Sequence, residues 1–331
     1  MLQETMQLLV VGISNNATGG SATVGGGYQN EATGTYSTVA GGNINNATAL
    51  YATVGGGVRN NATGNYATVA GGSSNEATVD RATVGGGSEN DAKGTYATIS
   101  GGYSNDATAA DSTVGGGSYN NARGARSTIP GGYDNTASGE YSFTVGRGCQ
   151  ADGNYSVAIG NTLSATNDGS WVIGDSNAGG TPIANRSSTK DDRFYGFFDN
   201  GYVLFTTEDG TDATGVYVLA GGNAWNSVSD KTKKENYKTV NKQDILNKLI
   251  AMPIEEWNYK SQDESIRHID PYAQDFDKAF GLGESELSID TIDADGVALE
   301  AAQALAERNK KLEAKVTALE YRLKKLESLF K

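Results

Sequence analysis

One cysteine, Cys149, and one histidine, His268, are the only thiol and imidazole groups in the chain. A lone cysteine has no intrachain partner for a disulfide, and a structural zinc site takes four cysteine or histidine ligands. A catalytic triad based on histidine would have to use His268. We therefore expect no metal site and no cofactor. His268 is predicted to be a structural hydrogen-bonding residue, and Cys149 a small packing residue.

The overall charge and hydropathy exclude two further classes of function. The net charge is −13, and an acidic surface repels a nucleic-acid backbone. No stretch reaches the ~18–20 apolar residues of a membrane span. The first residues, MLQETMQLLVVG, lack a basic residue before their apolar run, which is atypical of a signal peptide. We expect neither nucleic-acid binding nor membrane insertion.

The first half of the chain is an internal repeat of 15 residues. Each repeat holds a branched residue, an alanine eight residues later, and an asparagine two residues before that alanine. The branched residues are Val24, Val39, Val54, Val69, Val84, Ile99, Val114 and Ile129. The spacing then changes, because Val145 follows after 16 residues and Ile159 and Ile173 after 14 each.

A repeat this short predicts one coil of a solenoid, with two short strands and two tight turns. Stacked coils place each strand about 4.8 Å from its copies. Positions that recur in every coil are expected to point inward, and the asparagines to form an amide ladder. Variable positions, among them Tyr36, Tyr51, Tyr66 and Arg81, are expected to face solvent.

The segment YSVAIG at 155–160, followed by Ala165, resembles the 14-residue repeat of trimeric autotransporter adhesin heads. The resemblance implies a left-handed parallel β-roll, assembled as a trimer, over residues 9–180 after a lead-in at 1–8. A calcium-binding nonapeptide roll is disfavoured, because the period differs and the recurring polar residue is Asn rather than Asp. The helical C-terminal end differs from an outer-membrane anchor, which disfavours an autotransporter.

Two further elements follow the repeat. Residues 181–226 are predicted to form a small β connector, with a hairpin that turns at Asn200-Gly201. From Val297 to Lys331 the apolar spacing alternates between four and three, which is a heptad seam. The seam contains Leu305, Asn309, Leu312, Val316, Leu319, Leu323, Leu326 and Phe330. A parallel coiled coil is favoured over a single amphipathic helix on a globular core; the seam itself leaves the number of strands open.

Several motifs from Trp225 onward occur in a defined order: SDKTKKEN at 229–236, WNYK at 257–260, PYAQDF at 271–276 and DADGVAL at 293–299. Together they resemble the C-terminal intramolecular chaperone of endosialidase-type phage tail spikes. The resemblance implies an α+β domain over 227–331 that trimerises, guides folding and then cuts itself off. It assigns Ser229 as nucleophile, Lys234 as its base and Val228–Ser229 as the bond cleaved. Lys231 stands where the family has Arg.

These resemblances imply a trimeric structural and receptor-binding fibre of a phage tail or a phage-like injection system. Its partners would be two further copies and a glycan or protein receptor on the host or target cell. Its location would be a virion tail or an extracellular particle. At most it would be a single-turnover serine peptidase with a Ser-Lys dyad. A bacterial cell-surface adhesin is the alternative. A polysaccharide depolymerase is less favoured, because no local motif supplies the paired carboxylates of a glycosidase.

Overall fold

The computed structural model describes residues 8–9, 12–175, 186–198, 200–205, 215–283 and 285–329. The chain divides into two compact units. One comprises Met1–Tyr202 with Leu219–Gly222, and the other Val203–Val218 with Asn223–Lys331. The first unit consists of β-strands and tight turns, and the second carries the α-helices.

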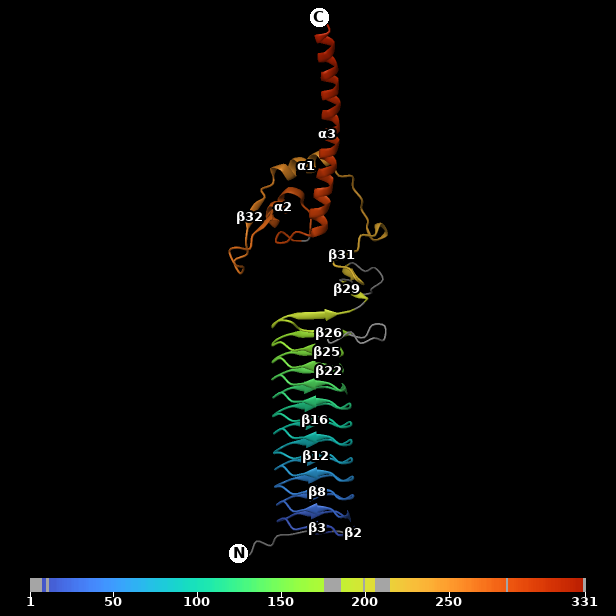
Figure 1. The fold of residues 1–331 in the computed structure, drawn as a ribbon, viewed down its shortest axis with the longest axis vertical. Helices are drawn as coiled ribbons and strands as arrows, with labels where there is room; N and C mark the ends of the chain where they lie inside the picture. The colour runs from blue at the N-terminus through green and yellow to red at the C-terminus, as the bar shows by residue number, and fades with distance from the viewer. Residues whose placement is uncertain are drawn as a thin grey trace. The chain divides into compact units, whose positions relative to one another are not determined.

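Each 15-residue repeat supplies one short strand to each of two sheets (Figure 1). β9 (Thr53–Val54) pairs in parallel with β11 (Thr68–Val69), and β10 (Asn61–Ala62) pairs in parallel with β12 (Glu76–Ala77). Because each strand pairs with its copies in the coils before and after, two long parallel sheets form, one of 14 strands and one of 12. The predicted mainly-β solenoid is therefore confirmed.

The two sheets contain the following strands. The 14-stranded sheet has β9 and β11 together with β1 (Leu8–Leu9), β4 (Thr23–Val24), β7 (Thr38–Val39), β13 (Thr83–Val84), β15 (Thr98–Ile99), β17 (Thr113–Val114), β19 (Thr128–Ile129), β20 (Gly132–Tyr133), β22 (Phe143–Arg147), β24 (Val157–Asn161), β26 (Trp171–Asp175) and β28 (Phe194–Phe197). The 12-stranded sheet has β10 and β12 together with β3 (Asn16–Ala17), β6 (Glu31–Ala32), β8 (Asn46–Ala47), β14 (Asp91–Ala92), β16 (Asp106–Ala107), β18 (Asn121–Ala122), β21 (Thr136–Ala137), β23 (Gln150–Ala151), β25 (Leu163–Ala165) and β27 (Arg186–Ser187). A separate pair joins β2 (Gly12–Ile13) to β5 (Gly27–Tyr28).

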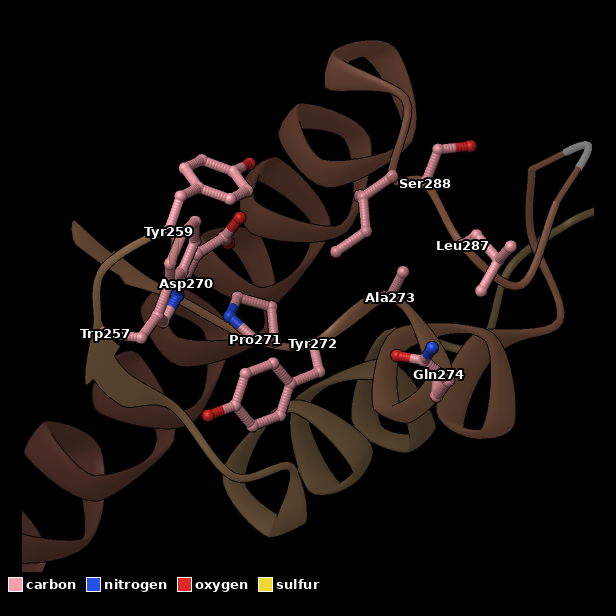
Figure 2. Close-up of a pocket in the computed structure, with 10 residues that line it drawn as sticks. Trp257, Tyr259, Asp270, Pro271, Tyr272, Ala273, Gln274, Leu287 and Ser288 are labelled. Atoms are coloured by element: carbon pink, nitrogen blue, oxygen red, sulfur yellow. The ribbon is translucent and has the colours of Figure 1, made fainter. Parts of the chain in front are cut away.

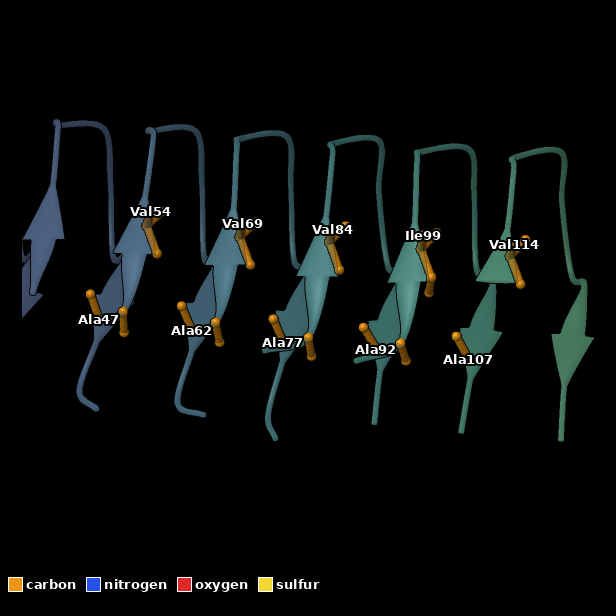
Figure 3. Packing of buried hydrophobic residues seen from close by; sticks show 14 of the residues in the cluster. Ala47, Val54, Ala62, Val69, Ala77, Val84, Ala92, Ile99, Ala107 and Val114 are labelled. Carbon is orange, nitrogen blue, oxygen red and sulfur yellow. The ribbon is translucent and has the colours of Figure 1, made fainter. Parts of the chain in front are cut away.

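The core of the solenoid is the predicted row of branched residues facing the predicted row of alanines (Figure 3). Val54 and Ala62 are 0 % exposed, as are their counterparts from Val24 to Ile129 and from Ala32 to Ala137. Burying one valine contributes about 2 kcal/mol, whereas ordering the backbone costs about 1 kcal/mol for each residue. A single coil is therefore unstable, and stability depends on stacking.

Buried asparagines tie each coil to the next. Asn60 is 0 % exposed, and its Nδ2 donates to the carbonyls of Gly56 (2.8 Å) and Gly72 (2.9 Å). Its Oδ1 accepts the Asn75 backbone N–H at 3.1 Å. The turn also requires glycine at position 57, where φ is +90° and an added Cβ would lie 2.1 Å from the carbonyl oxygen of Gly72. The predicted amide ladder is thus present and bonds mainly to the backbone.

The inward row was misassigned beyond Ile129. Thr128 pairs with Phe143, so the counterpart of Ile129 is Thr144 rather than Val145. Thr144, Ala158 and Val172 continue the buried row of Ile129 in the last coils. Val145, Ile159 and Ile173 are half-buried on the opposite face, because neighbouring side chains of a strand point to opposite sides. The 14-residue coils lose one residue of the Gly-rich turn, which gives the continuous strands β22, β24 and β26.

The predicted hairpin around Asn200-Gly201 is wrong. β28 (Phe194–Phe197) pairs in parallel with β26, with Phe194 opposite Trp171, so it continues the solenoid sheet. β29 (Gly201–Phe205) belongs instead to a three-stranded sheet with β30 (Gly215–Leu219) and β31 (Asn226–Ser227). The aromatic residues of β28 extend the stack that Phe143 and Trp171 begin, and this packing outweighs the local turn signal.

The second unit packs two short helices against the first part of a long one (Figure 1). α1 (Lys242–Ala251) and α2 (Ala273–Phe280) precede α3 (Thr291–Glu327). Leu246 of α1 packs with Ala301 and Ala304 of α3, and a second cluster joins Met252, Phe276 and Val297. β32 (Glu255–Trp257) and β33 (His268–Asp270) form an antiparallel pair.

Membrane-spanning helices and metal-binding side-chain clusters are both absent from the described ranges. None of their helices is long and apolar enough to cross a membrane. None of their His, Cys, Asp and Glu side chains form a group of three or more that could hold a metal ion.

Candidate functional site

The segment from Val228 to Lys234 connects a strand to a short turn. β31 pairs in antiparallel fashion with β30, and the Val228 N–H donates to the carbonyl of Gly215 at 3.2 Å. Asp230 then caps a three-residue 3-10 helix, Lys231–Lys233, by accepting the Thr232 N–H at 2.8 Å. This hydrogen bond from the Thr232 backbone holds the pKa of Asp230 below its ordinary value. The strand and the turn together flank the Val228–Ser229 bond.

The turn brings Lys234 back to Ser229. Nζ of Lys234 lies 2.6 Å from Oγ of Ser229 and donates a hydrogen bond to it. Both side chains are exposed in a single chain. A serine hydroxyl is a weak nucleophile until a base takes its proton, and a lysine amine is such a base only in its neutral form. The two groups are thus within proton-transfer distance.

His268 makes only structural contacts in the described part of the chain. Its Nε2 lies 2.9 Å from Oε1 of Gln262, and its ring lies 4.9 Å from that of Trp257 and 5.8 Å from that of Tyr259. This fits the predicted structural role. Cys149 is also buried, as a free thiol in the solenoid core, where burial raises its pKa.

A cavity of about 510 Å³ lies between the β32–β33 pair, the start of α2 and the segment 287–289. Figure 2 shows Trp257 and Tyr259 on one side of it and Leu287 and Ser288 on the other. At its edge the hydroxyl of Tyr272 donates to Glu255 at 2.9 Å, which raises the pKa of Tyr272. Sequence reasoning missed this cavity; its only signal was the cluster of aromatic residues.

The heptad seam of α3 is an exposed apolar stripe. Its described apolar members are between 45 and 61 % exposed: Leu305, Leu312, Val316, Leu319, Leu323 and Leu326. Asn309 is exposed as well, and Phe330 lies outside the described residues. Soluble helices seldom leave a continuous apolar stripe in water. The stripe is therefore available to a further helix.

Two edges of the solenoid carry exposed tyrosines with different geometry. On one edge Tyr51 is stacked between Tyr36 and Tyr66, with ring centroids 4.8 and 5.1 Å away, so neighbours cover both ring faces. On the other edge Tyr119 meets Tyr103 and Tyr133 edge to face, at 5.4 and 5.6 Å. The two edges thus differ in ring orientation, while Tyr51 and Tyr119 have similar exposed fractions of 44 and 46 %.

One protein-family model matches part of the C-terminal unit. Residues 229–281 match the family described as chaperone of endosialidase. No curated protein matches the chain. The β-solenoid and this match together fit a tail-fibre-like protein with a C-terminal chaperone domain of the endosialidase type. The match begins at Ser229, directly after the bond considered above.

Proposed function

We propose that the protein is a homotrimeric receptor-binding fibre of a phage tail or a phage-like injection particle, and that its C-terminal domain directs trimerisation and then cuts the Val228–Ser229 bond. The observation that carries this proposal is the 2.6 Å contact between Lys234 and Ser229, at the start of the segment that matches the chaperone family.

Two surfaces support assembly of three chains. The first is the apolar stripe of α3, which buries its leucines only when other helices pack on it. The second is the outer face of the 14-stranded sheet. The outward residues beside its buried valines are uncharged, as Thr53 and Gly55 illustrate. The outer face of the 12-stranded sheet carries Glu76, Asp91 and Asp106, and Lys93 on the same face pairs with Asp91 at 2.6 Å.

The charge distribution favours the face of the 14-stranded sheet as the contact between copies. Each chain has a net charge of −13, so acidic faces of three copies would repel one another at close range. The uncharged face lacks this repulsion, and in the last coils it carries a stack of Phe143, Val157, Trp171 and Phe194 in register. Trp171 is 52 % and Phe194 66 % exposed. We expect this face to be the contact between copies.

The cleavage begins as an intramolecular acyl transfer. Lys234, as the neutral amine, takes the proton of the Ser229 hydroxyl while Oγ bonds to the carbonyl carbon of Val228. The C–N bond of the peptide then breaks, and Lys234 returns the proton to the Ser229 nitrogen. The product is an ester between Val228 and the Ser229 oxygen, which one water hydrolyses to a Val228 carboxylate and a free Ser229. Because the attacked carbonyl belongs to the residue just before Ser229, proximity replaces substrate recognition.

Receptor contact is assigned to the edge with Tyr103, Tyr119 and Tyr133, since tyrosine offers an apolar face and a polar hydroxyl to a glycan or protein. Its test is binding of the fibre to target cells. Tyr119→Ala should weaken that binding, while Tyr51→Ala, on the stacked edge, should leave it unchanged. Equal binding by both variants and the wild type would remove the assignment.

Denaturing electrophoresis and intact mass of the wild type against Ser229→Ala test the cleavage. We expect the wild type as two products, residues 1–228 and 229–331, and the variant as one intact chain. Sedimentation of Ser229→Ala should give a trimer. A wild type that stays full length would refute self-cleavage, and a sedimenting monomer would refute the assembly.

A further inference from the structure

The turn that carries Lys234 lacks a core of its own. The 3-10 helix Lys231–Lys233 has no buried residue. Backbone contacts close it: the Lys233 N–H donates to the Asp230 carbonyl at 3.1 Å, and the Lys234 N–H to the Lys231 carbonyl at 3.2 Å. Hydrogen bonds of this length in an exposed turn only weakly fix the position of the Lys234 backbone. A further restraint is therefore needed to keep Nζ beside Ser229.

Tyr237 supplies such a restraint. Its hydroxyl lies 2.5 Å from the Lys231 carbonyl oxygen and 2.8 Å from that of Lys234. The hydroxyl has one proton, which it can give to either carbonyl or share between them. Because these carbonyls stand at the two ends of the turn, one side chain ties both ends together. The ring is otherwise largely exposed, at 63 %, so Tyr237 contributes little to a hydrophobic core.

The geometry points to Tyr237 as a positioning residue for the Ser229–Lys234 pair; this inference rests on the proposed self-cleavage. The phenol touches neither the bond that is cut nor Nζ, but it holds the backbone from which the Lys234 side chain extends. A long lysine side chain reaches 2.6 Å from Oγ only when its backbone is held, and misplacement of a reacting group by about 1 Å costs up to ~100-fold in rate. We expect removal of the hydroxyl to slow cleavage by about 10-fold.

The test is Tyr237→Phe in the full chain, which keeps the ring and deletes the hydroxyl. Tyr321→Phe is the matched control, since Tyr321 is an exposed tyrosine of α3, at 71 %. The chain is made by cell-free translation with a short pulse of labelled methionine, and samples are quenched during the chase. Met1 and Met6 label the product of residues 1–228, and Met252 labels that of residues 229–331.

The rate constant separates positioning from folding. Substituting a residue needed only for folding lowers the final amount of product. Substituting a positioning residue lowers the first-order rate constant of cleavage in the folded fraction, which is isolated by sedimentation. A chase at several pH values between about 7 and about 10 adds a second readout. We expect Tyr237→Phe to lower the rate throughout this range, because geometry is lost while the amine is retained.

Two results overturn the inference, and they are distinguishable. If the wild type, Tyr321→Phe and Tyr237→Phe all cleave at the same rate, the positioning role is wrong and the self-cleavage stands. If the wild type stays intact, as Ser229→Ala should, the proposed cleavage fails and the role of Tyr237 fails with it. A lower yield of Tyr237→Phe with an unchanged rate constant in its folded fraction also refutes positioning.

Discussion

Substitution of one asparagine of the buried ladder tests the account of what holds the coils together. In Asn60→Ala the alanine keeps the backbone and the Cβ but removes the amide that bridges two neighbouring coils. The Gly72 carbonyl keeps a second donor, the Val58 N–H at 2.9 Å. Among the described residues, the Asn75 N–H and the Gly56 carbonyl are left without another hydrogen-bond partner.

The magnitude follows from these two groups. A buried polar group left unsatisfied costs about 1–3 kcal/mol. The Asn75 N–H is buried, whereas the Gly56 carbonyl is only partly so and water can compensate for part of its loss. We therefore expect the free energy of unfolding to fall by about 3 kcal/mol per chain. The neighbour Asn61 is a matched control, because it lies on the outer face and is half-buried; Asn61→Ala should change stability by less than about 0.5 kcal/mol.

Urea unfolding of the full-length chain, kept intact by Ser229→Ala and followed by far-UV circular dichroism, measures both variants at one protein concentration. Hydrogen exchange at Asn75 adds a local readout, since its N–H loses its acceptor in Asn60→Ala and should exchange faster. Equal unfolding midpoints for Asn60→Ala and Asn61→Ala would refute the reasoning, because stacking of the valine and alanine rows alone would then hold the solenoid.

Three further results are expected. Lys234→Arg should slow cleavage at least about 100-fold, because arginine keeps the positive charge but does not lose its proton; loss of the intact chain on denaturing gels measures it, and unchanged cleavage would exclude Lys234 as the base. In the uncut Ser229→Ala chain, Leu319→Asp should dissociate the trimer in sedimentation, whereas Tyr321→Asp, off the seam, should leave it intact. A trimer in both cases would show that the seam is not the contact. Desolvation raises the folded-state pKa of Asp106, so its ionised form disfavours the folded state only above its unfolded pKa. Asp106→Asn should therefore raise the free energy of unfolding at pH 7 by less than about 1 kcal/mol. It should leave the free energy of unfolding unchanged below about pH 3. A larger effect in acid than at neutral pH would contradict this sign.

The backbone conformation at one turn of each coil could not be predicted from the residue types. The position occupied by Tyr36, Tyr51, Tyr66 and Arg81 has φ between +56° and +59°, a left-handed conformation that sequence rules reserve for Gly, Asn or Asp. Stacking of each side chain on the same position of the next coil gives a contact that offsets this cost. The pattern predicted exposure at this position but not its backbone conformation.

The change of repeat length shows where spacing becomes ambiguous. Counting branched residues leads from Ile129 to Val145, whereas hydrogen-bond register leads to Thr144. A shift of one residue moves a side chain to the opposite face, so the polar Thr144 is buried and Val145 is not. The segment at Phe194–Phe197 is similar: a local turn signal predicted a hairpin, but pairing with a strand of the preceding coil was more favourable.

The linear pattern by itself determined the solenoid, its inward rows and its amide ladder, because each depends on a period that every coil repeats. It also indicated the chaperone domain, because several short motifs occur there in a characteristic order. Only the tertiary structure decided which residues face inward after the period shortens, that Lys234 reaches Ser229, and that Tyr237 closes the turn between them. Those features depend on distances between residues that no period relates, and such distances are set only when the chain folds.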